Sequence, residues 1–456
     1  MSSKKYDFDY IIIGGGPAGS TAALNLAKKT KKRIALVEDY SIGGSDSERD
    51  VPYLFNLGFV HSFYKLQNLP EFSQQSLHYN LPTLVSRQIE TANNIAAERQ
   101  KTLETASVTL IGGHAYFVDS HTISVNDKQL TSEIFILATG SRLKTGNIAG
   151  LDVVDYFAPE SIVKLRRLPK NALVIGGGST GCEIASYLSE LGVKVVLIEK
   201  EAHLLPKEDP DVAEHLTEYF TKELGILVAT NSEVVALEST VQGKRVIFST
   251  NHQEKAAHIE CIILATGSAP VLDYGLENAG VKYKDTGITA NRLFQTSAKN
   301  IYAIGDCLGN EHSSTERAEY QAGLLVTNLA AKVKNFAQYN GFIRRVNTYP
   351  SIAIVGKTEA KLKKDKYKYA TSTVYLKNLP AGKIDDLNYG FVKVIADHTG
   401  RILGGAIFAP HAELAATELS LALRNRLTTT DLASAPHVAN NYNIAIKLAA
   451  RALLKK

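Results

Sequence analysis

The chain has 456 residues, a formal net charge of +5, and 45% hydrophobic and 21% charged residues, a balance typical of soluble globular proteins. It is too long for one ordinary hydrophobic core, so we expect about three domains. The positive charge is spread along the chain, and no basic stripe interleaved with aromatic residues appears, which argues against nucleic acid as a partner.

Cysteine usage and the N-terminal residues bear on the cellular compartment. The three cysteines stand at positions 182, 261 and 307 without a C-x-x-C pair, which favours a reducing compartment over a disulfide framework or a Cys-rich zinc site. The N-terminal residues lack the apolar core of a signal peptide, and no run of about eighteen apolar residues occurs. We therefore expect a cytoplasmic protein. No histidine cluster has metal-ligand spacing, so we expect no metal.

The first predicted unit is a strand, a glycine turn and a helix. The apolar strand leads into Gly14, Gly16 and Gly19 at the G-x-G-x-x-G spacing. In that pattern the first glycine permits the turn, the second lets backbone approach a pyrophosphate, and the third lets helix and strand pack closely. A second strand ends at Glu38, where a carboxylate can accept ribose hydroxyls. Residues 1 to about 40 thus predict a dinucleotide-binding βαβ unit; a glycine turn in another α/β protein is the alternative.

The next elements are expected to continue the same domain. Residues 40–107 are polar and largely helical by pattern, which indicates an insertion. Short strands follow at 108–111 and 122–125. They lead to a buried-type strand at 134–138, which opens into the small-residue turn 139–141.

The glycine pattern then occurs a second time. A strand at 172–175 runs into the turn 176–181, a helix follows, and the next strand ends at Glu199. A later strand ends in Ala-Thr-Gly at 265–267 and so repeats the Ala-Thr-Gly of 138–140. Two dinucleotide-binding modules in one chain suggest transfer of a hydride between two bound dinucleotides.

Glu199 also bears on which nicotinamide dinucleotide would bind. A carboxylate at this position accepts the ribose hydroxyls of NAD and repels a 2′-phosphate. Lys200 is the nearest cation, and no arginine directly follows the acid. We therefore expect NADH to be favoured over NADPH. Taken without the glycines, Glu199 would be a solvated acid at a strand end.

A third signature resembles a known family. Residues 296–306 form a strand ending in Gly-Asp before another helix, and they are similar to the second flavin motif of the FAD-dependent pyridine nucleotide-disulfide oxidoreductases. That family includes dihydrolipoyl dehydrogenase, glutathione reductase, mercuric reductase and the soluble transhydrogenase. The resemblance implies that Asp306 binds the ribityl or phosphate side of FAD. Asp306 could also be the N-cap of the following helix, which is compatible with that role.

The resemblance covers nearly the whole chain and implies its architecture. Segments at 347–356, 390–395, 401–404 and 411–414 are similar to the family's interface domain, which makes a two-fold dimer, so a homodimer is implied. The implied α/β fold has two Rossmann-like dinucleotide-binding domains of the three-layer β-β-α type and a C-terminal α+β interface/dimerisation domain. The expected boundaries are 1–150 for the first part of the FAD-binding domain with its insertion at about 40–107, 151–275 for the NAD-binding domain, 276–340 for the second part of the FAD-binding domain, and 341–456 for the interface domain.

The chain departs from the family at the redox disulfide, which reads Gly-Gly-Thr-Cys, four residues, then Cys-Ile-Pro-Ser-Lys. Here Asp46 falls at the first cysteine, Asp50 at the second if one residue is deleted between them, and Leu54 replaces the lysine. Carboxylates cannot make or break an S–S bond, so the thiol relay is absent. Asp46, Glu48 and Asp50 either place negative charge near the flavin, disfavouring its anionic reduced form, or form an exposed acidic loop.

The family's acid/base pair for the thiol is changed as well. It is a His-Pro-Thr segment with a glutamate four residues after the histidine. Here Pro436 occupies the histidine position, His437 is displaced by one, and Asn441 or Asn440 stands for the glutamate. Because asparagine cannot charge-stabilise an imidazolium, we interpret His437 as a surface or interface histidine.

Functional residues carry over from the family position by position. Glu183 lies where the family places a catalytic glutamate near flavin N5 and the nicotinamide; a plain helix-face acid is the alternative. Ser179 replaces an aromatic lid that some members hold over the flavin. Cys307 is interpreted as a small buried residue at a helix start, with a low-pKa thiol as the alternative. The expected cofactor-binding residues are Gly14, Gly16, Pro17, Ala18, Gly19, Glu38, Gly44, Ser45, Ala115, Ala138, Thr139, Gly140 and Asp306, with Gly176, Gly178, Ser179, Thr180, Gly181, Glu183, Glu199 and Gly267.

The expected function is that of an FAD-dependent NAD(P)H:acceptor oxidoreductase without a redox-active disulfide. Hydride would pass from NADH to FAD and then to a non-thiol acceptor: a quinone, oxygen, another nicotinamide or a partner protein. The alternatives are a degenerate FAD/NAD-binding sensor, and a thiol–disulfide reductase with a relay through Cys307 or a substrate thiol. The basic amphipathic helix at 443–456 is expected to pack in the interface domain rather than contact a membrane surface.

Overall fold

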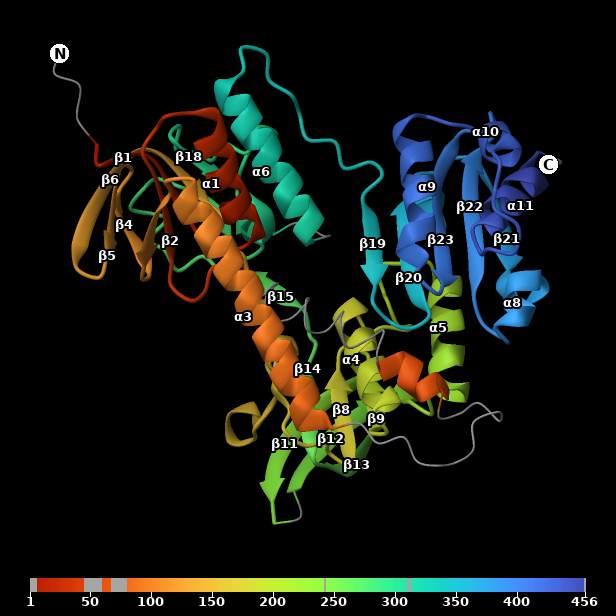
Figure 1. Cartoon of the computed structure of the whole chain (residues 1–456). Helices are drawn as coiled ribbons and strands as arrows, with labels where there is room; N and C mark the ends of the chain where they lie inside the picture. Colours follow the sequence, from red (N-terminus) through yellow and green to blue (C-terminus); the bar gives the residue numbers. More distant parts are fainter. Residues whose placement is uncertain (1–5, 45–59, 67–79, 242, 310–312, 455–456) are drawn as a thin grey trace. The chain divides into compact units, whose positions relative to one another are not determined.

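The computed structural model describes residues 6–44, 60–66, 80–241, 243–309 and 313–454 (Figure 1). The chain divides into two compact units. The first comprises Met1–Tyr53, Asn80–Lys144 and Ser268–Gln338, and the second comprises Leu54–Tyr79, Thr145–Gly267 and Tyr339–Lys456. The domain boundaries expected from the sequence stay a prediction.

The first unit is built on a sheet with strand order β3-β2-β1-β6-β5-β4. Strand β18 pairs with the C-terminal residues of β6, from Phe135 to Leu137. Strands β1, β2, β3 and β18 run parallel, and β4, β5 and β6 form an antiparallel meander. The bounds are β1 Phe8–Ile13, β2 Ile34–Glu38, β3 Thr109–Gly112, β4 Ala115–Asp119, β5 Thr122–Val125, β6 Lys128–Leu137 and β18 Ile301–Ala303.

Two cores on opposite faces of this sheet give the unit its β-β-α layering. Ile12 of β1 points into a core with helices α1, α3 and α6, whereas Ile11 and Ile13 point into a second core with the meander. This alternation follows from the two-residue period of a strand. Helices α1 and α6 lie side by side in Figure 1. The remaining elements are α1 Pro17–Lys29, α3 Leu81–Thr105, β7 Ser141–Leu143, β15 Ser268–Pro270, β16 Tyr283–Lys284, β17 Gly287–Ile288, η3 Gly305–Leu308 and α6 Thr315–Ala330.

The sequence predicted a largely helical insertion at 40–107. Helix α3 and the helical residues 60–66 account for the described part of it, and the remainder lies outside the described residues. The side chain of Asn80 caps α3 by accepting a hydrogen bond from the Thr83 N–H at 3.1 Å.

The second unit contains the second βαβ module. Its parallel sheet has the order β10-β9-β8-β14, and an antiparallel sheet β11-β12-β13 follows in the chain. The bounds are η1 Leu151–Val153, η2 Pro159–Lys164, β8 Asn171–Ile175, α4 Ser179–Glu190, β9 Lys194–Ile198, α5 Pro210–Lys222, β10 Leu227–Ala229, β11 Ser232–Thr240, β12 Gly243–Thr250, β13 Gln253–Ile259 and β14 Cys261–Leu264.

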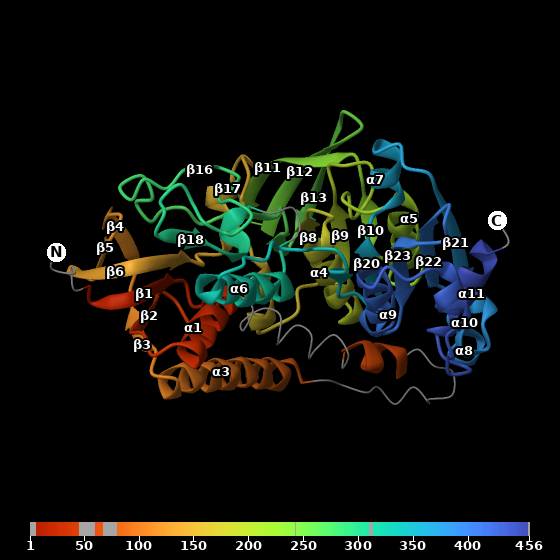
Figure 2. The same ribbon diagram turned by 90° about the horizontal axis from the view of Figure 1, so that it is seen from above.

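The same unit contains the C-terminal domain, an antiparallel sheet of order β19-β20-β23-β22-β21 covered by helices (Figure 2). Helix α11 packs Ala445, Ile446, Ala449, Ala450 and Leu453 into this core, as expected, but Leu454 is 51% exposed. The bounds are β19 Ile343–Val346, β20 Ser351–Gly356, α7 Glu359–Lys364, β21 Tyr369–Tyr375, η4 Leu376–Asn378, α8 Pro380–Ile384, β22 Phe391–Asp397, β23 Ile402–Ala409, α9 Ala412–Arg424, α10 Thr429–Ser434 and α11 Ile444–Leu453.

Candidate dinucleotide-binding sites

The glycine turn after β1 leaves space in front of helix α1. A Cβ on Gly14 would lie 2.2 Å from the Ala138 carbonyl oxygen, and one on Gly19 would lie 1.8 Å from the Gly14 oxygen. These two glycines are therefore required for packing. A Cβ on Gly16 would meet nothing within 4 Å, and Gly16 is the N-cap of α1 without a side-chain cap. The first N–H groups of a helix have no partner within the helix, and a pyrophosphate fits the space that the described residues leave in front of them.

Glu38 is held against this turn. Its carboxylate accepts hydrogen bonds from the N–H of Gly15 and, at 2.8 Å, from that of Tyr40. Burial raises the pKa of Glu38 above its ordinary value, although both hydrogen bonds act in the opposite direction. The carboxylate is thus fixed beside the space in front of Gly16, where ribose hydroxyls adjoining a pyrophosphate would lie.

Asp306 reaches the same end of the sheet from a distant part of the chain. Strand β18 pairs with β6, so that Asp306 lies near the turn after β6, and the Ser141 hydroxyl donates to its carboxylate at 3.1 Å. The N-cap alternative is wrong, because Ser314 caps α6 by accepting from the Arg317 N–H at 3.2 Å. Ser141 was missed as a site residue, although it directly follows the Ala-Thr-Gly turn.

The other expected residues of the first unit lie as follows. Gly44 lies against the glycine turn, since a Cβ added to it would be 3.1 Å from the Gly16 Cα. Ala115 is buried on β4. Thr139 donates from its hydroxyl to the Val271 oxygen at 2.9 Å. Pro17 and Ala18 begin α1, and Gly140 has φ +67°. Ser45, Asp46, Glu48, Asp50 and Leu54 lie outside the described residues.

The second module repeats this geometry. A Cβ on Gly176 would lie 2.4 Å from the Ala265 oxygen, one on Gly181 would lie 1.8 Å from the Gly176 oxygen, and one on Gly178 would meet nothing within 4 Å. Gly178 is again an N-cap without a side-chain cap, here of α4, which begins with Ser179 and Thr180. The turn after β14 ends at Gly267, where a Cβ would also meet open space. A second pyrophosphate therefore fits here.

Glu199 corresponds to Glu38 in this module. Its carboxylate accepts from the Gly177 N–H at 2.6 Å and from the Glu201 N–H at 2.8 Å. The residue is 5% exposed, so the interpretation as a solvated acid is wrong. The ammonium of Lys200 lies 3.9 Å from the Glu201 carboxylate, and its side chain is exposed.

Glu183 lies in the first turns of helix α4, two residues after Gly181. Its carboxylate accepts a hydrogen bond from the Asn347 N–H at 2.8 Å, which connects the helix to the segment between β19 and β20. The catalytic role near flavin and nicotinamide stays a prediction.

The thiols are unsuited to redox chemistry with a substrate. All three cysteines are free and buried. Burial raises the pKa of Cys307 to about 12 and that of Cys261 to about 11, and it raises the pKa of Cys182 well above the ordinary value. The Cys307 thiol donates to the Ile304 oxygen at 3.1 Å. The interpretation of Cys307 as a small buried residue is confirmed, and the low-pKa alternative is wrong.

His437 has a partner that the sequence did not suggest. Its Nε2 lies 3.0 Å from the Glu418 carboxylate of α9, and its Nδ1 lies 3.0 Å from the Ala435 oxygen. Both ring nitrogens therefore have partners other than Asn440 and Asn441. Its side chain is 5% exposed, so of the two interpretations the surface one is wrong, and the interface one stays a prediction. His437 and Glu418 line a cavity of about 370 Å³ between α9, α10 and the following turn.

Comparison with known proteins decides the family. The model of the pyridine nucleotide-disulphide oxidoreductases matches residues 8–322, and that of their dimerisation domain matches residues 344–450. The chain belongs to this family. It is therefore an FAD-dependent pyridine nucleotide oxidoreductase with the α/β architecture that the family resemblance implied.

The names of relatives in the family indicate different electron acceptors. The chain is 30% identical over 420 residues to a soluble pyridine nucleotide transhydrogenase of Photorhabdus laumondii, covering 89% of this chain and 88% of that protein. It is 29% identical over 434 residues to a mercuric reductase of Bacillus cereus, covering 94% of this chain and 68% of that protein.

Two solved structures have closely similar folds. LpdA from Mycobacterium tuberculosis superimposes with a TM-score of 0.86 at 26% identity, covering 97% of this chain and 99% of that one. The HOCl-induced flavoprotein disulfide reductase RclA from Escherichia coli gives 0.86 at 21% identity, with the same coverage. No helix among the described residues is long and apolar enough to cross a membrane.

Proposed function

We propose that this enzyme oxidises NADH through FAD and passes the electrons to an acceptor that requires no enzyme thiol. The observation that carries the proposal is the state of the cysteines. The family's relay needs a reactive pair, and all three sulfurs of this chain are buried with raised pKa values. The acceptor belongs among quinones, oxygen, a second nicotinamide and partner redox proteins.

The cofactor assignment rests on the two glycine turns. In the first unit, Gly16, Glu38 and Asp306 would hold FAD, and Ser141 would orient the Asp306 carboxylate. In the second unit, Gly178 and Glu199 would hold the pyridine nucleotide. Bound FAD supplies a two-electron acceptor for hydride and a donor to the next acceptor.

NADH is proposed as the preferred reductant because of the negative charge of the Glu199 carboxylate. A 2′-phosphate would meet a buried carboxylate there. The exposed Lys200 faces Glu201 and gives that phosphate no buried cationic partner. We expect kcat/KM for NADH to exceed that for NADPH by at least about tenfold, which corresponds to roughly 1.4 kcal/mol.

An anaerobic titration tests the proposal. Purified protein reconstituted with FAD is mixed with NADH, and bleaching of the flavin absorbance is followed. Prompt bleaching is expected, whereas an unresponsive flavin would support the sensor alternative. The reduced protein is then offered a quinone, oxygen, thio-NAD⁺, lipoamide and glutathione disulfide. Steady NADH-dependent reduction of either disulfide would contradict the proposal.

A substitution separates the proposal from a relay through Cys307. Cys307→Ala should leave NADH:acceptor turnover within about twofold, since a residue that carries no electrons contributes nothing to the transition state. The loss of the buried sulfur should cost about 1 kcal/mol of stability. Steady-state kinetics with the best acceptor of the panel measure the effect, with Cys182→Ala as the matched control. A loss of a hundredfold in Cys307→Ala alone would restore the thiol hypothesis.

A further inference from the structure

The connection between β9 and α5 begins directly after Glu199, and we call residues 200–209 the β9–α5 loop. Its first half is tied to the glycine turn. The Glu201 N–H donates to the Glu199 carboxylate at 2.8 Å, and the Leu205 N–H donates to the Gly177 oxygen at 2.8 Å. Leu204 is fully buried, and its Cδ2 would lie 2.6 Å from a Cβ on Gly177. The loop therefore sets the position of the Glu199 carboxylate.

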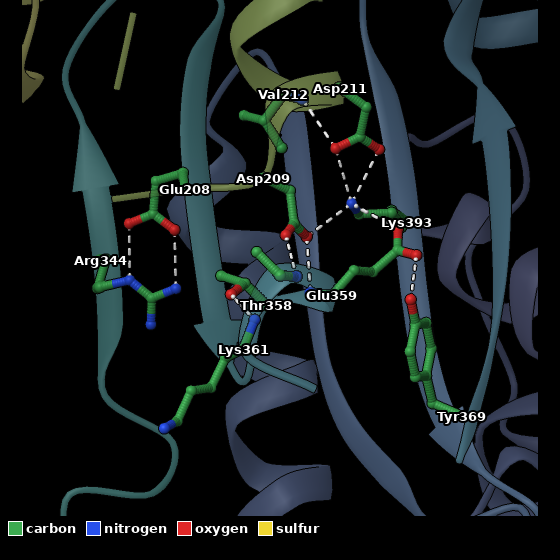
Figure 3. Close-up of polar contacts among 11 residues, drawn as sticks. Glu208, Asp209, Asp211, Val212, Arg344, Thr358, Glu359, Lys361, Tyr369 and Lys393 are labelled. Atoms are coloured by element: carbon green, nitrogen blue, oxygen red, sulfur yellow. Dashed lines mark hydrogen bonds and ion pairs between the residues drawn. The ribbon is translucent and has the colours of Figure 1, made fainter. Parts of the chain in front are cut away.

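The last two residues of the loop are held by the C-terminal domain (Figure 3). Arg344 of β19 binds the Glu208 carboxylate in a bidentate pair, with N–O distances of 2.8 and 2.9 Å. Asp209 accepts from Lys393 at 2.9 Å and from the N–H groups of Glu359 and Ala360 at 3.0 and 2.9 Å.

The loop is strained between these two attachments. Leu205 has φ +50°, a left-handed conformation that is unfavourable for a leucine. Such a conformation persists only where surrounding contacts impose it. The Glu208–Arg344 pair is 9% and 19% exposed, so little solvent competes for it, and the guanidinium also donates to the Gly356 oxygen at 3.1 Å.

We propose that Arg344 is a positioning residue for the pyridine nucleotide. By fixing Glu208, it fixes the β9–α5 loop and with it the carboxylate of Glu199, so the dimerisation domain sets the affinity for the nucleotide and its selectivity for NADH. The inference rests on the proposed role of Glu199 in binding the adenosine ribose. Without Arg344 the loop relaxes around Leu205, and binding has to order it again.

The variant Arg344→Gln tests this coupling by equilibrium binding of NADH to the FAD-loaded protein, measured by calorimetry under anaerobic conditions without acceptor. We expect the dissociation constant to rise about tenfold, equivalent to about 1.4 kcal/mol. FAD content and kcat should stay within about twofold, and selectivity against NADPH should fall, because only the position of the loop has changed. Amide hydrogen exchange across 200–208 should accelerate.

A matched control breaks an ion pair of the same chemistry in the same unit. Arg245 binds Glu238 at 2.8 Å across β11 and β12, away from the loop, so Arg245→Gln should leave NADH binding unchanged. Glu208→Gln, a nearly isosteric change, should reproduce the effect of Arg344→Gln. The double variant should add nothing further, since both changes remove one interaction.

The outcomes separate this inference from the proposed function. Unchanged NADH affinity in Glu208→Gln overturns the role of Arg344, including the case in which Arg344→Gln fails to fold. An equal loss in Arg245→Gln would mean a general destabilisation and would also overturn it. If the unaltered protein is not reduced by NADH and binds neither nucleotide, the proposed function fails first, and the inference falls with it.

Discussion

Replacing Lys393 with methionine should lower the free energy of unfolding by about 3–5 kcal/mol, the cost of leaving a buried ion pair without one partner. Lys393 is the third residue of β22, and its side chain is 1% exposed. It binds Asp209 at 2.9 Å, Asp211 at 2.8 Å and Glu359 at 3.1 Å (Figure 3). Methionine fills a similar volume, but the carboxylates lose their cation, and the Asp209 side chain is only 5% exposed.

Urea unfolding of the FAD-loaded protein, followed by far-UV circular dichroism, measures this effect. Lys222→Met is the control, because it removes an exposed ion pair with Glu218 on α5 that is worth at most about 0.5 kcal/mol. Adding Asp209→Asn to Lys393→Met should recover part of the loss by removing the buried charge. A Lys393→Met protein as stable as the unaltered one would contradict the account of this cluster.

The same cluster predicts how stability depends on pH. Burial alone would raise the pKa of Asp209, but hydrogen bonds from Ala360, Glu359 and Lys393 hold it below its ordinary value. Burial alone would lower the pKa of Lys393, but Asp211 and Asp209 hold it above its ordinary value. The contribution of Asp209 is therefore lost as pH falls below about 4, and that of Lys393 as pH rises above about 10.4.

The stability difference between the unaltered protein and Lys393→Met should accordingly be flat from about pH 5 to pH 9 and shrink on both sides of that range. Urea midpoints across this range measure it. A difference that changed steeply near pH 7 would show that another titrating group controls the cluster.

The two βαβ modules could be predicted from the sequence because their determinants are local. The glycine spacing, the apolar strands and the acid at the end of the second strand all lie within about forty residues. The structure has β1, α1 and β2 where the pattern placed them, and β8 and β9 likewise. The layer on the other face of the first sheet was implied by the family resemblance and not by the residues themselves.

The Lys393 cluster could not be predicted in this way. Lys393 and Asp209 are separated by 184 positions and meet only when β22 packs against the start of α5. One signal was available: a lysine flanked on both sides by apolar residues in a strand must be paired if it is buried. The sequence does not say with which carboxylate.

Two further differences have the same origin. Family spacing placed Asn441 or Asn440 at the position of the glutamate partner of His437, yet its carboxylate partner is Glu418, which precedes it by 19 positions on α9. Asp306 was read as a possible cap for the next helix, but Gly309 in a left-handed conformation ends the intervening 3₁₀ turn, and Ser314 takes the cap position. In both cases the partner is a residue that the spacing of the family motif does not point to.

Alanine substitutions at Gly16 and Gly178, the two glycines whose Cβ positions are free, should weaken the binding of FAD and of NADH separately. Gly16 and Gly178 have φ values of −66° and −69°, which alanine adopts without strain, and their Cβ positions are free of protein atoms. Gly16→Ala should therefore fold but lose FAD, with its affinity reduced about a hundredfold, or roughly 2.7 kcal/mol. Gly178→Ala should keep FAD and lose NADH affinity by a similar factor. Flavin absorbance after gel filtration and anaerobic NADH titration measure the two losses.

The packing glycines supply the contrast that makes this result interpretable. A Cβ on Gly19 or Gly181 would lie 1.8 Å from a carbonyl oxygen of the turn, so alanine there should prevent the strand and helix from packing and yield little folded protein. The methyl groups at Gly16 and Gly178 instead occupy only the space before the helix N–H groups. If Gly16→Ala retained FAD at full occupancy, the pyrophosphate would not lie over α1. The two-site description of the chain would then fail at its first module.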